Sequence, residues 1–577
     1  MIDINKKVET LKKGIDISLN KKKIDLLLKN AKLINTFSGD IYKTDIAVHD
    51  GKIVGFGSYD AKNVIDLKGM YVSPGFIDGH IHVESSMVKI PEFAKVVLPC
   101  GTTSVVIDPH EIANVLGTEG IKYMLSSSID AMLGVYVMLP SCVPSTNLET
   151  SGATLSANDL SLLLNDERVI GIAEVMNYPG VLNGDRDLLM KIAIANGKII
   201  DGHAPFLSGK GLYAYVSSGI KSEHECSNIE EAREKLRAGM YIMIREGTAA
   251  KNLKSLIKLV NSDNSRKMLF VTDDRHLEDI NNEGHINYLV KKAIEYGVDP
   301  VKAIQMATIN TAEYFRLNNL GAILPGYSAD MIVFDNLKKI NIKMVFKNGV
   351  MVSKNGKIVD GIIKEYKEKL RGTINVRWIE HDDFALKAES KKARVINVIP
   401  NEIITKMTVE DVKVDGGYVS CDTERDILKI AVIERHMASG RIAKGLVRGF
   451  KLKKGAIASS ISHDSHNIIV VGTYDEDMYQ AAVGVVKMQG GICAALNGQI
   501  LESLPLPVAG LMSDRSADFV RTKLRRLREV AKYLGSELPD PFMAMSFLTL
   551  PPIPEIKITD RGIIDANKFK VIDLFVK

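Results

Sequence analysis

Between about residues 73 and 320, short apolar runs alternate with helical stretches roughly every 25 residues, and this rhythm constrains the fold most strongly. Continuous apolar runs of this kind predict strands buried on both faces, as in a parallel sheet covered by helices. Eight of them in about 250 residues favour a closed (β/α)₈ barrel over a doubly wound open sheet. The eight runs are Tyr71–Ile77, Thr103–Ile107, Leu133–Leu139, Val169–Ala173, Lys198–Ile200, Ile220–Ser222, Tyr241–Ile244 and Met268–Val271.

The segments on both sides of this alternating region share a different texture of short strands and tight turns. Asp50-Gly51 is a hairpin signal on one side, and Asn348-Gly349 separates two strand-like runs on the other. We therefore expect an α/β protein in which a small β domain, built from both flanks, accompanies a TIM-like barrel. Beyond it, strand-like and helical runs predict a C-terminal α/β domain. The predicted domains are residues 1–72 with 321–375, residues 73–320 and residues 376–577.

The composition is that of a globular protein with nearly balanced charge. Of its 577 residues, 75 are basic and 70 acidic, and the net charge of +5 argues against a nucleic-acid partner. The lysine-rich start is expected to be a solvated, partly frayed segment. We see neither a signal peptide nor an apolar run long enough for a membrane span, and the five cysteines form no C-x-x-C pair. We expect a cytoplasmic homo-oligomer, a dimer, with no membrane partner.

The ends of the predicted strands carry an unusual concentration of polar residues. An active site in such a barrel lies where the strands end at their C-terminal face, and five of the 12 histidines fall there. His80 and His82 alternate along a strand, so they point to the same side and can bind one ion together. Imidazole and carboxylate ligands suit zinc, iron or manganese. The strand-end residues are His80, His82, Asp108, His110, Glu111, Glu174, His203, His224, Arg245, Glu246 and Asp273.

The histidine pair 80–82, followed by His203, His224 and Asp273, resembles the amidohydrolase superfamily. Residues 72–78 look like the superfamily's entry into its first barrel strand, and residues 326–330 look like its return to the small domain. The resemblance covers roughly residues 25 to 355 and implies a divalent metal centre. The ligands it implies are His80, His82, Glu174, His203, His224 and Asp273.

Glu174 indicates which members of the superfamily this chain resembles. Many binuclear amidohydrolases use a carboxylated lysine after the fourth strand, but residues 171–177 contain no lysine, and Glu174 is a candidate to bridge two ions directly. As an alternative, Glu174 supports the ligands from outside the metal shell. Together with residues 108–111, 461–467 and 548–554, this glutamate resembles the bacterial adenine deaminase family. That resemblance implies hydrolytic deamination of adenine to hypoxanthine and ammonia, at a binuclear Mn²⁺ or Fe²⁺ centre with Zn²⁺ as another option.

The resemblance and the chemistry of deamination also suggest roles for individual residues. Asp273 is expected to accept the proton of the attacking water while also being a ligand. His110 or Glu111 is expected to protonate the purine ring or the leaving amine. The residues expected to contact or orient the purine are Asp108, Arg245 and Glu246.

Several alternatives stay open at this level. Asp108 and Arg245 pair with each other across the barrel mouth in one alternative. His463 and His466 form either a metal site or a domain contact, and a structural or interface role is favoured. An amidohydrolase that cuts a cyclic amide or imide, of the hydantoinase or dihydroorotase kind, is the nearest rival function. A non-catalytic barrel scaffold is the rival of another class, although such relatives usually lose metal ligands.

Overall fold

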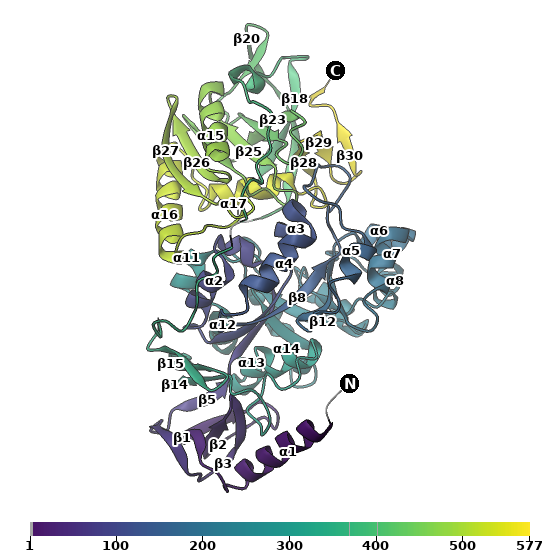
Figure 1. Ribbon diagram of the computed structural model, residues 1–577. Helices are drawn as coiled ribbons and strands as arrows, with labels where there is room; N and C mark the ends of the chain where they lie inside the picture. The colour runs from purple at the N-terminus through teal and green to yellow at the C-terminus, as the bar shows by residue number, and fades with distance from the viewer. Residues whose placement is uncertain (1–3, 369, 401, 577) are drawn as a thin grey trace.

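The computed structural model describes residues 4–368, 370–400 and 402–576, and its three parts lie in a row along the molecule (Figure 1). A nine-stranded sheet at the N-terminal end takes strands from both flanks of the barrel segment, because β5 (Tyr71–Pro74) pairs antiparallel with β14 (Met331–Phe334). Its other strands are β1 (Ile24–Asn35), β2 (Asp40–His49), β3 (Lys52–Phe56), β4 (Ala61–Asp66), β15 (Ile342–Lys347), β16 (Val350–Lys354) and β17 (Lys357–Ile358).

The N-terminal segment is helical where the sequence led us to expect fraying. Helix α1 (Ile4–Ser18) lies beside this sheet and buries Ile17. Its apolar residues recur at helical spacing, which explains the helix, but they remain largely exposed. The exposed apolar side chains on α1 are Ile4, Val8, Leu11 and Ile15.

Eight parallel strands form the middle part, in one sheet of five strands and one of three. Single hydrogen bonds join the two sheets at both ends: Lys221 N donates to Ile200 O at 3.1 Å, and Asp273 N donates to His80 O at 2.9 Å. The strands are β6 (Phe76–Ile81), β7 (Thr102–Ile107), β8 (Gly134–Pro140), β9 (Val169–Val175), β10 (Ile199–Gly202), β11 (Ser222–Glu223), β12 (Tyr241–Arg245) and β13 (Met268–Val271).

The first predicted strand, residues 71–77, is two strands instead of one. Gly75 separates β5 from β6, and its N–H donates to Asp330 O at 2.9 Å. A Cβ at Gly75 would lie 2.2 Å from Thr103 Oγ1, so a side chain does not fit at this switch between sheets. The predicted domain boundary at residue 72 falls inside β5, whereas β6 continues to Ile81 and carries His80 within the strand.

Helices surround the parallel strands, as the alternating pattern predicts (Figure 1). Most are short, and several begin soon after a polar residue at the end of a strand. These helices are α2 (Ile90–Val97), α3 (His110–Leu116), α4 (Thr118–Ser127), α5 (Ala157–Ser161), α6 (Tyr178–Asn183), α7 (Arg186–Ala193), α8 (Gly209–Ser217), α9 (Ile229–Arg237), α10 (Leu253–Leu256), α11 (Leu277–Asn282), α12 (Ile286–Glu295), α13 (Pro300–Met306) and α14 (Ile309–Tyr314).

The C-terminal part is built on a second nine-stranded sheet. Helix α15 (Asp475–Lys487) packs on this sheet, and α16 (Ala517–Tyr533) and α17 (Pro541–Ser546) complete the α/β arrangement. Among the described residues, no helix is long and apolar enough to cross a membrane. The strands of this sheet are β18 (Lys392–Val398), β19 (Thr405–Asp411), β22 (Leu428–Ile433), β23 (Ile442–Arg448), β24 (Ala456–Ser459), β25 (Ile468–Gly472), β26 (Gly491–Leu496), β27 (Gln499–Pro505) and β31 (Phe575–Val576).

Candidate active site

His80 and His82 face one carboxylate at the end of the first barrel strand. His82 Nε2 lies 3.1 Å from Asp273 Oδ1, and His80 Nε2 lies 3.6 Å from the same oxygen. All three side chains are buried. The alternation predicted for the histidine pair therefore brings both imidazoles to the end of β13, where Asp273 follows the strand.

Glu174 lies at the centre of the predicted ligand set and uses its two oxygens differently. Oε1 faces the first pair, 3.4 Å from His82 Nε2 and 3.8 Å from His80 Nε2. Oε2 faces the second pair, 2.7 Å from His203 Nδ1 and 3.3 Å from His224 Nε2. The structure thus brings all six predicted ligands together, with one carboxylate between two histidine pairs.

The chemistry of this cluster fits a divalent metal ion. His80 Nε2 is buried and has no hydrogen-bond partner among the described residues. Two of the groups in this cluster contain His80 and offer ligand atoms that all lie within 4.8 Å of one another: His80 with His82 and Asp273, and His80 with Glu174 and His224. A buried lone pair that faces carboxylates costs free energy unless a cation binds between them. The donor set of imidazoles and carboxylates suits manganese, iron or zinc.

Arg245 holds the carboxylate of Asp273 from the outer side. Its Nη1 donates to Asp273 Oδ2 at 2.6 Å and to Glu225 Oε1 at 2.5 Å, while Nη2 donates to Glu225 Oε2 at 2.7 Å. Burial raises the pKa of Asp273, but the Arg245 guanidinium and the bonds from His80 and His82 together outweigh it and hold that pKa well below its usual range. The alternative in which Arg245 pairs with Asp108 is therefore wrong, because Glu225 and Asp273 are its carboxylate partners.

Asp108 pairs with a neighbour in the sequence instead. Its carboxylate accepts from His110 N at 3.1 Å, and its Oδ2 lies 2.9 Å from His110 Nδ1. The other ring nitrogen, His110 Nε2, lies 3.3 Å from Glu111 Oε1. Burial lowers the pKa of His110, but the charges of Asp108 and Glu111 outweigh it and hold that pKa well above its ordinary value. His110 is also close to the metal cluster, with Nδ1 3.5 Å from Glu174 Oε1.

Glu246 lies apart from the other predicted substrate residue on its strand. Its Oε1 accepts from Leu253 N at 3.2 Å, at the start of α10. Among the described residues that line the neighbouring cavity, Arg245 is present and Glu246 is not. The position of the Glu246 side chain does not favour the predicted contact with the substrate, because its carboxylate is engaged with a helix N-terminus.

The segment 461–467, which links β24 to β25, reaches the barrel mouth from the C-terminal part. His463 Nδ1 lies 2.7 Å from Glu111 Oε1, and His466 Nε2 bonds Glu111 Oε2. Asp464 Oδ1 lies 3.9 Å from His110 Nε2, and its Oδ2 is buried without a hydrogen-bond partner among the described residues. The domain contact favoured by the sequence is therefore present, and it is made at a predicted catalytic side chain.

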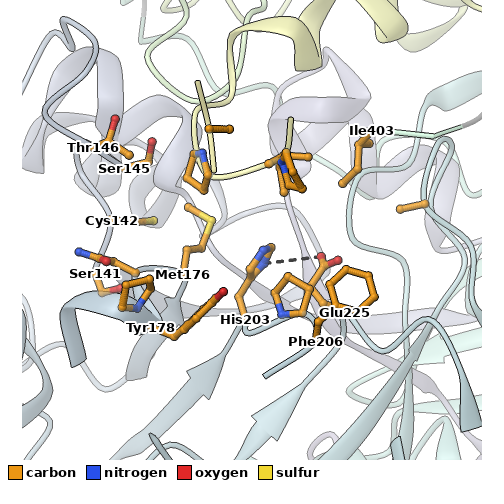
Figure 2. Close-up of a pocket in the computed structure, with 18 of the residues that line it drawn as sticks. Ser141, Cys142, Ser145, Thr146, Met176, Tyr178, His203, Phe206, Glu225 and Ile403 are labelled. Carbon is orange, nitrogen blue, oxygen red and sulfur yellow. Dashed lines mark ion pairs between the residues drawn. The ribbon is translucent and has the colours of Figure 1, made fainter. Parts of the chain in front are cut away.

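A cavity of about 1090 Å³ opens beside the cluster, between barrel loops and the C-terminal part. Figure 2 shows His203 and Glu225 joined by an ion pair at its base, with Nδ1 and Oε1 3.5 Å apart. Residues 141–146 lie on one side of the view, and Ile403 of the C-terminal part lies on the other. Both parts of the chain thus border the cavity beside the cluster.

Sequence reasoning missed two acidic residues of this site. Glu225 directly follows His224 in the sequence. Its place next to a strand-end histidine was a signal for it. Asp464 lies between two histidines, but its connection to the barrel depends on a contact that spans more than 350 positions of sequence, as for Glu111 and His463.

Comparison with known proteins agrees with this geometry. Residues 71–358 match the amidohydrolase family, and residues 402–570 match the adenine deaminase C-terminal domain. The chain is 49% identical to adenine deaminase 2 of Carboxydothermus hydrogenoformans over 98% of this chain and 99% of that protein. It is also 49% identical to the adenine deaminase of Thermosipho africanus, again over 98% and 99%. A crystal structure of an adenine deaminase gives a TM-score of 0.44 at 18% identity, covering 58% of this chain and 100% of that one.

Parallel strands that deliver histidines and carboxylates to one end, together with the family match, define an amidohydrolase. The relatives that match along nearly the whole chain define the group more closely. The chain belongs to the adenine deaminase family, as its motifs predicted.

Proposed function

We propose that this chain hydrolyses adenine to hypoxanthine and ammonia at the cluster around Glu174. The observation that carries the proposal is the complete ligand set at one barrel end, in a chain related along its length to adenine deaminases. In the reaction, the oxygen of water bonds to C6 of the purine, the C6–N6 bond breaks, and the amino group leaves as ammonia. One group must accept the proton of water and another must protonate the ring or the amine.

We infer that the six residues of the cluster would hold two divalent ions, with Glu174 between them. This inference is supported by the way Glu174 Oε1 faces His80 and His82 while Oε2 faces His203 and His224. Manganese and iron are the expected ions, and zinc is the alternative. Bound divalent ions would supply an activated water, since they lower its pKa towards about 7.

Asp273 accepts the proton of the attacking water in this proposal. Its Oδ1 faces the metal-binding histidines, and its Oδ2 is fixed by Arg245. The guanidinium and the two histidines together keep the carboxylate ionised, so that it is able to accept a proton. Arg245 also lines the cavity, so it is in a position to contact the purine while it holds Asp273.

His110 supplies the second proton in this proposal, in preference to Glu111. Four carboxylates surround its ring: Asp108 at 2.9 Å, Glu111 at 3.3 Å, Glu174 at 3.5 Å and Asp464 at 3.9 Å. Such surroundings favour the imidazolium, which is a proton donor. Glu111 is held ionised, because the charges of nearby histidines lower its pKa despite burial. Asp108 then orients His110 instead of binding the purine.

The proposed function is tested by incubating the Mn²⁺-loaded enzyme with adenine and measuring ammonia and hypoxanthine. We expect one ammonia and one hypoxanthine for each adenine consumed. Turnover of a hydantoin or dihydroorotate without ammonia release from adenine would favour the cyclic-imide alternative. Inactivity on both substrate classes at full metal occupancy would favour the non-catalytic scaffold.

Four further features remain predictions: the closure of all eight strands into one barrel, the precise domain limits, the dimer and the cytoplasmic location.

A further inference from the structure

Glu111 is held by two histidines that come from a different part of the chain. The segment 461–467 is buried along its whole length between β24 and β25. His463 Nδ1 lies 2.7 Å from one oxygen of Glu111, and His466 Nε2 bonds the other oxygen. We call this arrangement, His463 and His466 on Glu111, the histidine clamp.

The same three residues have the composition of a metal site, but the surroundings of His466 argue against one. Ser462 N–H donates to His466 Nδ1 at 3.2 Å, so that nitrogen presents its lone pair. Burial lowers the pKa of His466 to about 4, which leaves a neutral ring with a single proton. That proton is therefore on Nε2, where it is donated to Glu111. A metal on Nε2 would need the proton on Nδ1, directly facing the Ser462 N–H.

The clamp is itself fixed from several directions. Thr549 Oγ1 donates to His463 O at 3.0 Å, and the His463 ring stacks on Phe547 with centroids 4.5 Å apart and planes at 11°. Asn467 Nδ2 donates to Thr150 O at 2.9 Å, which ties the segment to the barrel. Side chains restrained in this way can hold a neighbour in one geometry at little further entropic cost.

Glu111 passes this restraint to the proposed proton donor. Its Oε1 lies 3.3 Å from His110 Nε2, and the opposite side of that imidazole is held by Asp108. If Glu111 rotated away, His110 would lose one of the carboxylates that fix its ring. The chain of contacts therefore runs from the C-terminal part, through Glu111, to a ring nitrogen beside the metal cluster.

We propose that His463 and His466 are positioning residues for deamination, which act by holding Glu111 against His110. This inference rests on the proposed function, because it assigns the C-terminal part a role in the same reaction. The kind of group that the clamp binds is a carboxylate of this chain, not a metal ion.

The test compares His466→Phe, which keeps a ring and removes the donor, with His466→Gln, which keeps an N–H. For His466→Phe we expect kcat for adenine to fall about ten- to a hundredfold with KM changed less than about threefold, as for other residues that orient a catalytic group. His466→Gln should recover most of the loss. Metal per chain should equal the wild-type value in both variants, whereas loss of an equivalent would overturn the clamp in favour of a metal site.

A double-variant comparison asks whether the effect passes through Glu111. In a Glu111→Gln background, His466→Phe should lower kcat by less than about threefold more, because coupled residues are not additive. Full multiplication of the two effects would overturn the proposal. The matched control is His436→Gln, another buried histidine, which bonds Ser465 O at 2.7 Å and has no contact with Glu111. A loss there as large as in His466→Phe would mean that the segment is merely destabilised.

Two further measurements test the clamp independently of the proposed function. If His466→Phe does not fold, His463→Phe removes the bond to the other oxygen of Glu111 and gives the same test. If the wild-type enzyme does not deaminate adenine, the proposed function fails, and crystal structures still decide the clamp. Glu111 should stay at His110 in the wild type and rotate away in His466→Phe, and an unmoved Glu111 would refute the positioning role.

Discussion

The cluster pair His80 and His82 and the clamp pair His463 and His466 each face a glutamate, and they use it in different ways. His80 and His82 face Glu174 with imidazole nitrogens that lie 3.4 to 3.8 Å from its oxygen, and His80 Nε2 has no hydrogen-bond partner in the described chain. His463 and His466 bond both oxygens of Glu111, and the second nitrogen of His466 accepts from a backbone N–H. The first arrangement has room and lone pairs for a cation, while the second is already satisfied by hydrogen bonds.

The comparison shows that histidine spacing alone does not define a metal site. The two pairs differ in what occupies the remaining ring nitrogens and in how many carboxylates converge. Glu174 and Asp273 both approach the first pair, so the buried negative charge there exceeds what neutral imidazoles balance. At His463 and His466, by contrast, a single carboxylate, that of Glu111, is bonded by both histidines. Ligand chemistry should therefore separate the two pairs experimentally.

Removal of the metal should have the largest effect on activity, and it should affect the site of His80 and His82 and not the clamp. Treatment with a chelator is expected to reduce adenine turnover to background, since the activated water is lost. Adding Mn²⁺ back should restore activity at two equivalents per chain, as measured by metal analysis during titration. A need for three equivalents would mean that the clamp is also a metal site and would remove the distinction between the pairs.

Substitution of Asp273 by asparagine should have the next largest effect. The change removes the proposed base and a metal ligand together, so kcat/KM is expected to fall at least about a thousandfold. Circular dichroism should show an intact fold, because Asn keeps the shape of the side chain. A loss of less than about tenfold would show that Asp273 has neither role. Asp518→Asn, at an exposed position of α16, is a control that should stay near wild-type activity.

The barrel side of the site was largely predictable from the sequence, because it depends on local periodicity. A strand of period two brings His80 and His82 to one side, and parallel strands end at one face, so Glu174, His203 and Asp273 follow from their positions. The main local error was the break at Gly75, where the run of apolar residues continues through a change of sheet.

The C-terminal side was not predictable in the same way. Glu111 and His463 are 352 positions apart, and neither strand period nor turn chemistry relates two segments at that separation. The roles of Glu225 and Arg245 were hidden for a related reason, since their pairing depends on how neighbouring strands are placed in space. Sequence pattern identifies which residues reach a strand end, but the partner of each residue is set by tertiary packing.

The smallest expected effect concerns the ionisation of carboxyl groups on the two sides. Glu174 is held ionised, because hydrogen bonds from His203 and His224 outweigh its burial and lower its pKa. Glu149, on the loop near segment 461–467, is also buried, but it bonds Ser145 and faces the negative charge of Asp464. Burial and that charge raise the pKa of Glu149 to about 8.

Replacing Glu149 by glutamine should therefore stabilise the protein, and more so at alkaline pH. The folded state keeps the carboxyl protonated up to about pH 8, while the unfolded chain releases the proton above about pH 4.5. Between these values the unfolded state binds fewer protons, so stability falls as pH rises, by an amount on the order of 3 kcal/mol at pH 7.

Glutamine at position 149 cannot ionise, and it still accepts the Ser145 hydrogen bond. The melting temperature of Glu149→Gln should exceed that of the wild type by a few degrees at pH 8 and by much less at pH 5, whereas Glu119→Gln, at an exposed position of α4, should show no such trend. An equal difference at both pH values would mean that Glu149 is ionised in the folded protein, and the two sides of the site would then treat their carboxylates alike.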